Sequence, residues 1–100
     1  MNILKAIVFN LEKPAVLSVR KTDTINLFAV GLLKNQLLKK HKASIPSLLT
    51  VLTGSFEFRI DNKNIRLAQF DTLQIPVNEE HEVEGLDERN VFTILQEKRG

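Results

Sequence analysis

The sequence predicts an all-β domain, and three observations lead to this fold class. From Val16 onward, short apolar or alternating segments recur at close spacing, with turn-forming residues between them. No segment between them is long enough for a helical crossover, which favours antiparallel pairing. About eight or nine short strands in this arrangement are typical of a β-sandwich or a β-barrel. A chain of 100 residues is the size of one domain, so we expect residues 1–100 to fold as a unit.

The segment before the first predicted strand has a mixed character. Ile3, Ile7 and Leu11 recur at helical spacing, Asn2 is a suitable N-cap, and Pro14 ends any helix before it. The same segment is also rich in residues that favour strands. The prediction is therefore a short N-terminal helix or an extended arm, and the sequence leaves both open.

The strands follow from apolar content and from the turn residues that separate them. In chain order, the predicted strands are Val16–Arg20, Ile25–Leu33, Leu37–Lys42, Ser47–Thr53, Ser55–Ile60, Ile65–Ala68, Thr72–Ile75, His81–Glu84 and Val91–Gln96. The turn signals between them include Lys21–Thr24, Asn35, Pro46, Gly54 and Asp61–Asn64. Gly54 stands between two strands with no other residue, so we expect a bulge or a sharp bend there.

The strand after this bend alternates most regularly. Phe56, Phe58 and Ile60 fall on one face, and Glu57 and Arg59 fall on the other. A pair of Phe rings on one face also occurs in stacking platforms for single-stranded nucleic acid. The chain has no Trp or Tyr, however, so its Phe rings are needed in the core. We expect this face to point inward.

The composition excludes several classes of function. The chain has no Cys, which rules out disulfides, thiolate nucleophiles, Cys-ligated zinc and iron–sulfur clusters. A formal charge of +2 is too small to favour nucleic-acid binding. The longest apolar run, residues 27–33, is too short to cross a membrane. The N-terminus is interrupted by Lys5 and lacks a small-residue cleavage site, so we expect a cytoplasmic protein with no membrane or nucleic-acid partner.

Two runs of like charge flank the segments that hold the two histidines. The basic run consists of Lys34, Lys39, Lys40 and Lys42, and the acidic run of Glu79, Glu80, Glu82, Glu84, Asp87 and Glu88. Each run is consistent with a solvated face, and the basic run also with a phosphate patch. If the two runs lie close in the fold, they partly neutralise each other, which weakens any attraction for phosphate.

His41 and His81 are the only histidines. His41 lies at the end of a predicted strand, and His81 begins another after a loop that contains a proline. Alternation places His81 on the same face as Val83. If Val83 points into the core, His81 points inward too.

The region around these histidines resembles a small single-domain cupin. The first cupin motif runs from a glycine through His-x-His and a glutamate to a closing glycine. Counting back from Gly54 as the closing glycine places Ser47 at the glutamate position, Ala43 at the second histidine and His41 at the first. Asn35 then replaces the opening glycine, at a position where Asn tolerates the left-handed backbone that glycine supplies.

The second cupin motif runs from a glycine through Pro-x-Gly and a histidine to an asparagine. Pro76 and His81 match it, while Phe70 replaces the opening glycine, Asn78 the middle glycine and Gly85 the final asparagine. The resemblance covers about residues 25–96. Both histidines of the chain fall on family ligand positions in this register.

The resemblance implies a jelly-roll β-barrel, and it suggests a homodimer that pairs through the apolar N-terminus. Metal-binding cupins use three histidines and one glutamate. This chain keeps His41 and His81, whereas Ala43 cannot coordinate and neutral Ser47 is a poor ligand for a divalent ion. A cofactor is therefore not certain, and a divalent zinc, iron, nickel or manganese ion remains the alternative.

Three functional hypotheses follow. The leading one is a binding protein for a small molecule, with a pocket in the barrel centred on His41 and His81 and completed by Ala43, Ser47, Phe56 and Phe58. The second is a metal-dependent cupin enzyme whose ion is held by the two histidines. The third is a non-catalytic interaction module whose barrel is filled by side chains, namely Leu48, Leu49, Val51, Leu52, Phe56, Phe58, Ile60 and Leu73. The sequence leaves enzymatic activity and the identity of the ligand open.

Overall fold

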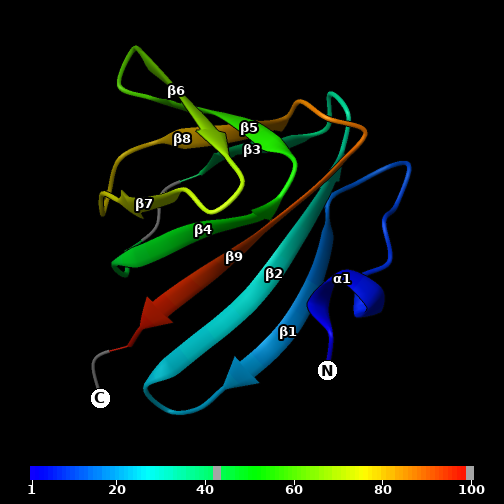
Figure 1. Cartoon of the computed structure of the whole chain (residues 1–100). Coiled ribbons are helices and arrows are strands. Elements are labelled where there is room, and N and C mark those ends of the chain that lie inside the picture. Colours follow the sequence, from blue (N-terminus) through cyan, green and yellow to red (C-terminus); the bar gives the residue numbers. More distant parts are fainter. Residues whose placement is uncertain (42–43, 99–100) are drawn as a thin grey trace.

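A computed structural model describes residues 1–41 and 44–98, without the side chains of Lys40 and His41. In this part of the chain, one short helix precedes nine strands (Figure 1). The elements are α1 (Ile3–Ala6), β1 (Ala15–Lys21), β2 (Ile25–Leu33), β3 (Leu37–His41), β4 (Ser47–Thr53), β5 (Ser55–Ile60), β6 (Lys63–Ala68), β7 (Thr72–Ile75), β8 (His81–Gly85) and β9 (Arg89–Glu97). The predicted all-β fold class is confirmed, and every strand begins and ends within two residues of its predicted bounds.

The strands form two sheets that lie as layers over each other (Figure 1). The five-stranded sheet has the order β1-β2-β9-β4-β7, and the four-stranded sheet has the order β3-β8-β5-β6. Neighbouring strands pair antiparallel in both, as predicted. Gly54 joins β4 of one sheet to β5 of the other, so the predicted bend is the point where the chain changes layers.

Apolar side chains pack against one another between the two sheets. The buried core there consists of Val30, Leu32, Leu49, Val51, Phe56, Phe58, Ile60, Leu67, Ile75, Val83, Phe92 and Ile94. The rings of Phe56 and Phe92 meet edge to face, with their centroids 4.9 Å apart. The inward face of β5 is therefore the predicted one. Burial of these side chains is the main source of stability.

A second apolar cluster covers part of the outer face of the five-stranded sheet. Ile7 and Phe9 of the N-terminal segment pack there against Ala29 and Val91. Gly31 lies beneath them, since a Cβ at this position would approach Ile7 and Phe9 to 3.0 Å. The N-terminal segment thus combines both predicted forms, with a single helical turn followed by an extended arm.

Two leucines of β4 lie on a different face from the one predicted. Leu48 and Leu52 were expected to fill the barrel, but the strand alternates, and Leu49 and Val51 take the inward positions. Leu52 packs instead against the second cluster on the outer face. A continuous apolar run predicts a strand without showing which of its residues face inward, because here both faces are partly covered.

The corner where the sheets meet depends on a fully buried asparagine. The Nδ2 group of Asn90 donates hydrogen bonds to the carbonyls of Leu32 and Asp87, at 3.0 and 2.9 Å. Its Oδ1 accepts from the backbone N–H groups of Ser55 and Asp87, both at 3.0 Å. All the hydrogen-bonding capacity of this amide is used, so burying it carries no unpaired polar group. A Cβ on Gly54 would lie 2.4 Å from this Oδ1, which explains the glycine.

Candidate functional site

The backbone supports the register of the two cupin motifs. The four positions where the motifs carry a glycine are occupied by Asn35, Gly54, Phe70 and Asn78. All four have left-handed φ angles, of 69°, 80°, 71° and 62° respectively. Glycine adopts this conformation at little cost and asparagine tolerates it. The turns of the two motifs thus keep their left-handed backbone conformation, although most of the motif glycines are replaced by other residues.

His81 is buried at the start of β8, with only 3% of its surface exposed. Its ring stacks on Phe58, with centroids 5.3 Å apart and an angle of 18° between the planes. Its Nδ1 lies 3.1 Å from the backbone carbonyl of Glu79. Because a carbonyl only accepts, Nδ1 carries the proton of this hydrogen bond, and the neutral ring has its lone pair on Nε2. The side chain is therefore fixed in both orientation and tautomer.

His41 is the backbone partner of His81 between β3 and β8. The structure therefore brings these two positions together, as the motif register requires. The side chain of His41 lies outside the described part of the structure, and so does the whole of Ala43.

Ser47, at the glutamate position of the first motif, is buried and its hydroxyl is already engaged. It donates to the carbonyl of Ile45 at 3.1 Å and accepts from Nε2 of Gln96 at 3.2 Å. The Oε1 of Gln96 in turn accepts from Nδ2 of Asn26 at 3.3 Å. The three side chains form a polar row across β4, β9 and β2. Ser47 is therefore part of this row of hydrogen bonds.

An open cleft of about 780 Å³ lies over His81. It wraps the end of the four-stranded sheet, between the β5–β6 turn at 61–62 and the β7–β8 loop. Ile60 and His81 form the buried part of its lining, while Arg59 and Glu82 contribute from the outer face of the sheet. Of the predicted pocket residues with described side chains, His81 is the one that lines this cleft.

The other predicted pocket residues lie elsewhere. Phe56 and Phe58 are fully buried in the core, where Phe58 supports the ring of His81 from beneath. Ser47 borders a second hollow of about 400 Å³, together with Leu48 and Leu95. The cleft over His81 opens at the end of the four-stranded sheet, next to the buried core.

The described side chains do not complete a metal site. Among residues 1–41 and 44–98, apart from the two side chains not described, no group of three or more His, Asp or Glu residues is placed to hold an ion. The fixed tautomer of His81 suits a metal ligand, because such histidines usually donate their second ring N–H to a carbonyl or carboxylate. Ser47 does not suit one, since both its proton and a lone pair are used.

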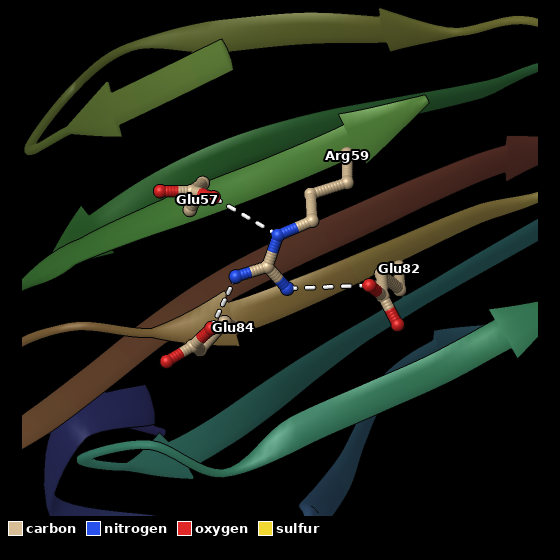
Figure 2. A network of polar contacts seen from close by, with 4 residues as sticks. All are labelled: Glu57, Arg59, Glu82 and Glu84. Carbon is tan, nitrogen blue, oxygen red and sulfur yellow. Dashed lines mark hydrogen bonds and ion pairs between the residues drawn. The ribbon is translucent and has the colours of Figure 1, made fainter. Parts of the chain in front are cut away.

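Arg59 forms the centre of an ionic network beside the cleft (Figure 2). Its Nε lies 2.9 Å from a carboxylate oxygen of Glu57, and its Nη1 lies 3.2 Å from one of Glu82. Its Nη2 contacts Glu84. All four side chains project from the outer face of β5 and β8 and are about one-fifth to one-third exposed. The hydrogen bond that Arg59 donates to Glu84, followed by its contacts with Glu57, raises the pKa of Arg59 further above its ordinary value.

The sequence analysis did not identify this network. The alternation of β5 places Glu57 and Arg59 on one face, and that of β8 does the same for Glu82 and Glu84. The missing information is that β5 and β8, separated by two other strands in the chain, are neighbours in the sheet. Alternating charges of opposite sign on two strands are the signal that could have suggested the pairing.

Solved structures of other proteins show the fold independently. A cupin superfamily protein from Desulfitobacterium hafniense aligns over 99% of this chain and 90% of its own, with 14% identity and a TM-score of 0.87. A conserved protein with a double-stranded β-helix domain from Klebsiella pneumoniae aligns over 97% of this chain and 87% of its own, with 14% identity and a TM-score of 0.87. An RmlC-like cupin family protein from Methanocaldococcus jannaschii aligns over 92% and 88%, with 12% identity and a TM-score of 0.77.

Comparisons at the level of sequence find no counterpart. No model of a known protein family matches the chain, and no curated protein matches it. Among residues 1–41 and 44–98, no helix has the length and apolar character that a membrane crossing requires. The likeness to solved structures, together with the motif turns and the two antiparallel sheets, shows that this chain has the fold of a small cupin, a jelly-roll β-barrel of the double-stranded β-helix type.

Proposed function

We propose that this chain is a binding protein for a small molecule and that the ligand occupies the cleft over His81. One observation carries the proposal: a buried histidine with a fixed tautomer lies in an open cleft of about 780 Å³. Its volume falls within the range of small-molecule sites. A histidine that served only to fill the core would not require an open cleft beside it. His41, the strand partner of His81, is the second residue we assign to the site.

The experiment is a thermal-shift screen of small molecules against the wild type and the variant His81→Phe. A phenyl ring retains the stacking on Phe58 and the apolar burial, so we expect the variant to fold with unchanged or higher stability. It removes both ring nitrogens, so compounds that stabilise the wild type should lose most of their effect. Val16→Ser, at an exposed position on β1 outside the cleft, is the control and should keep it.

The same screen also tests the hypothesis that the chain is a non-catalytic interaction module. A barrel that only serves as a scaffold would give the same screening profile in the wild type and in His81→Phe. That result would contradict the proposal.

A metal-dependent enzyme is the second candidate, and the held orientation of His81 is the observation in its favour. Against it, Ser47 is engaged elsewhere and Ala43 offers no donor atom. Because the donor set does not fit, we derive no metal-dependent step. Elemental analysis of untagged protein decides between the candidates. Stoichiometric zinc, iron, nickel or manganese that disappears in His41→Ala and His81→Ala would favour the enzyme.

We further propose that the chain is a cytoplasmic homodimer. The N-terminal segment supports the dimer, because it exposes Leu4, Val8 and Leu11 on the side that faces away from the sheet. Exposed apolar residues grouped on one segment are typical of interaction surfaces. The cytoplasmic location is tested by fractionation of cells that express the protein.

A further inference from the structure

The described residues that line the cleft over His81 include more carboxylates than cations. Among the described residues that line it, Arg59 and Lys63 are basic and Asp61, Glu79, Glu80 and Glu82 are carboxylates, which gives these residues a formal charge of −2 with neutral His81. A balance of this sign does not favour a phosphate or a carboxylate ligand. How strongly the cleft disfavours an anion depends on whether Arg59 and Lys63 can contact it.

Arg59 is not available to an anionic ligand. Each of the three nitrogens of its guanidinium group already contacts a carboxylate oxygen, from Glu57, Glu82 and Glu84 (Figure 2). An anion that reached Arg59 would displace one of these partners and would meet the repulsion of the other two. Lys63 lies on the exposed rim, two residues from Asp61, where water screens its charge.

The carboxylates of the rim do not make the cleft a strong cation site either. Asp61, Glu79 and Glu80 are exposed, so their attraction for an amine is screened by water. Glu82, which is partly buried, is already paired with Arg59. The electrostatics therefore disfavour anions clearly and favour cations only weakly.

The hydrogen-bonding groups of the cleft suit hydroxyl groups. Asn62, Asn64 and Asn78 each offer an amide that both donates and accepts, and the carboxylates add acceptors. A hydroxyl group also donates and accepts, so it can pair with either kind of group. Within the described part of the lining, Ile60 is the one aliphatic residue. A ligand that fits this lining is polar over most of its surface.

We propose that the cleft binds an uncharged, hydroxyl-rich small molecule and that the carboxylates around Arg59 exclude anions from it. This inference rests on the proposed function, in which the cleft is the ligand site. Glu82 and Glu84 are then residues that determine specificity, because they occupy the guanidinium that a phosphate or carboxylate would otherwise bind. Rejecting the wrong ligand in this way is a common route to specificity.

The experiment compares three classes of probe by NMR titration of the wild type. They are a panel of neutral mono- and disaccharides, inorganic phosphate, and the diamine putrescine. We expect saturable binding of at least one neutral sugar, weakened about tenfold or more in His81→Phe. We expect no saturable binding of phosphate or putrescine at concentrations up to about 10 mM.

A double variant tests the role of the carboxylates. Glu82→Gln with Glu84→Gln removes two negative charges and releases two arms of Arg59 for a bidentate contact with phosphate. We expect the affinity for phosphate to rise about tenfold or more. Glu12→Gln with Glu88→Gln is the matched control, since it makes the same change in net charge at exposed positions outside the cleft and the network.

The outcomes separate this inference from the proposed function. If phosphate or putrescine binds the wild type and His81→Phe abolishes the binding, the cleft is a ligand site but the ligand class is wrong. If the matched control gains as much phosphate affinity as the double variant, the role assigned to Glu82 and Glu84 is wrong. If no probe of any class, and no compound of the thermal-shift screen, binds in a manner that depends on His81, both proposals fail.

Discussion

Phe70 combines a left-handed backbone with an exposed ring, a rare pairing for an aromatic residue. Its φ angle is 71° and 76% of its surface is exposed. For most L-residues this left-handed conformation costs about 1–2 kcal/mol of conformational free energy, whereas asparagine tolerates it better. The turn itself is held by hydrogen bonds between the backbones of Phe70 and Val51 and of Asp71 and Ala68.

We predict that Phe70→Asn stabilises the protein by about 0.5–1 kcal/mol, because it relieves the backbone and gives up little buried area. Urea unfolding of the two proteins measures the difference. Phe70→Ala keeps the backbone penalty and should show no gain. A loss of stability in Phe70→Asn would mean that the ring makes contacts the fold needs.

At Gly54, in contrast to Phe70, we expect a substitution to lower the stability of the fold. Its φ angle is 80°, and an added Cβ would lie 2.4 Å from Oδ1 of Asn90 and 2.6 Å from the carbonyl of Arg89. We predict that Gly54→Ala destabilises the fold by about 3 kcal/mol, from the backbone penalty together with overpacking. Gly31→Ala is the control, since its Cβ would meet only side-chain atoms of Ile7 and Phe9 at 3.0 Å. Equal losses in both variants would refute this account of the corner.

Single residues also show what the sequence could and could not predict about the site. The inward direction of His81 follows from its alternation with buried Val83, and it was predicted correctly. The engagement of Ser47 by Gln96 was not predictable, because the two residues are 49 positions apart and meet only through the pairing of β4 with β9.

Among the elements, β5 and β8 depend most on electrostatics. Their register places Glu57 opposite Glu84, a pairing of like charges that is unfavourable by itself. Arg59 lies diagonally between them and contacts both. The network therefore stabilises this strand pair mainly by cancelling a repulsion.

We predict that Arg59→Met lowers the free energy of unfolding by about 1 kcal/mol at low ionic strength, a value expected for a partly exposed network. The loss should shrink in 1 M sodium chloride, because salt screens the repulsion among the remaining carboxylates. Glu88→Gln, outside the network, is the control and should change stability little. A loss that is equal at low and high salt would show that Arg59 acts through packing and not through charge.

The pH dependence of this contribution follows from the direction of the pKa shift. The carboxylates raise the pKa of Arg59, so its folded-state value lies above its unfolded-state value. A base with a raised pKa contributes stability that is fully present below its unfolded pKa and is lost only above it. We therefore expect the difference in melting temperature between the wild type and Arg59→Met to be the same at pH 6 and pH 9. A marked decline over this range would contradict the assignment.

The strands were predictable because their signals are local. Alternation, apolar runs and residues such as Asn35, Gly54 and the pair at 61–62 define where strands start and stop. The partners of each strand were not predictable from such signals. The inward assignment of Leu48 and Leu52 in the filled-barrel hypothesis failed for that reason. Leu52 packs under the N-terminal arm, which covers part of the outer face, and Leu48 borders the second hollow.

The whole molecule has two apolar layers, the filled interior and the region beneath the N-terminal segment. That segment is held to the fold by Gln36, whose Nε2 donates to the carbonyl of Asn10 at 2.6 Å, and by the side chains of Ile7 and Phe9. Its far side leaves Val8 and Leu11 exposed at 80% and 89%. A second copy of the chain that covered this side would bury both.

We predict from this surface that the wild type has the mass of a dimer in light scattering at micromolar concentration. Val8→Ser with Leu11→Ser should shift the mass to that of one chain without lowering the melting temperature of the monomer, because neither side chain packs against its own fold. Val16→Ser, also exposed but on β1, is the control. A wild type with the mass of one chain would rule the dimer out.

At the scale of the whole molecule, the sequence predicted the cupin fold, and the position of the site stays a prediction. The motif register located His41 and His81 correctly as partners, and the turns confirm that register. Phe56 and Phe58, which were predicted to form pocket walls, are fully buried in the core. Whether a barrel is open depends on the combined volume of all inward side chains, which a motif does not specify.

The most direct test of the central claim is to map the binding of a compound from the thermal-shift screen by amide chemical shifts. If the cleft over His81 is the ligand site, the perturbed amides should lie in residues 59–64 and 78–82 and should be absent in His81→Phe. Perturbations confined to the second hollow, at residues 46–48 and 95–98, would contradict the claim and move the site to the other sheet.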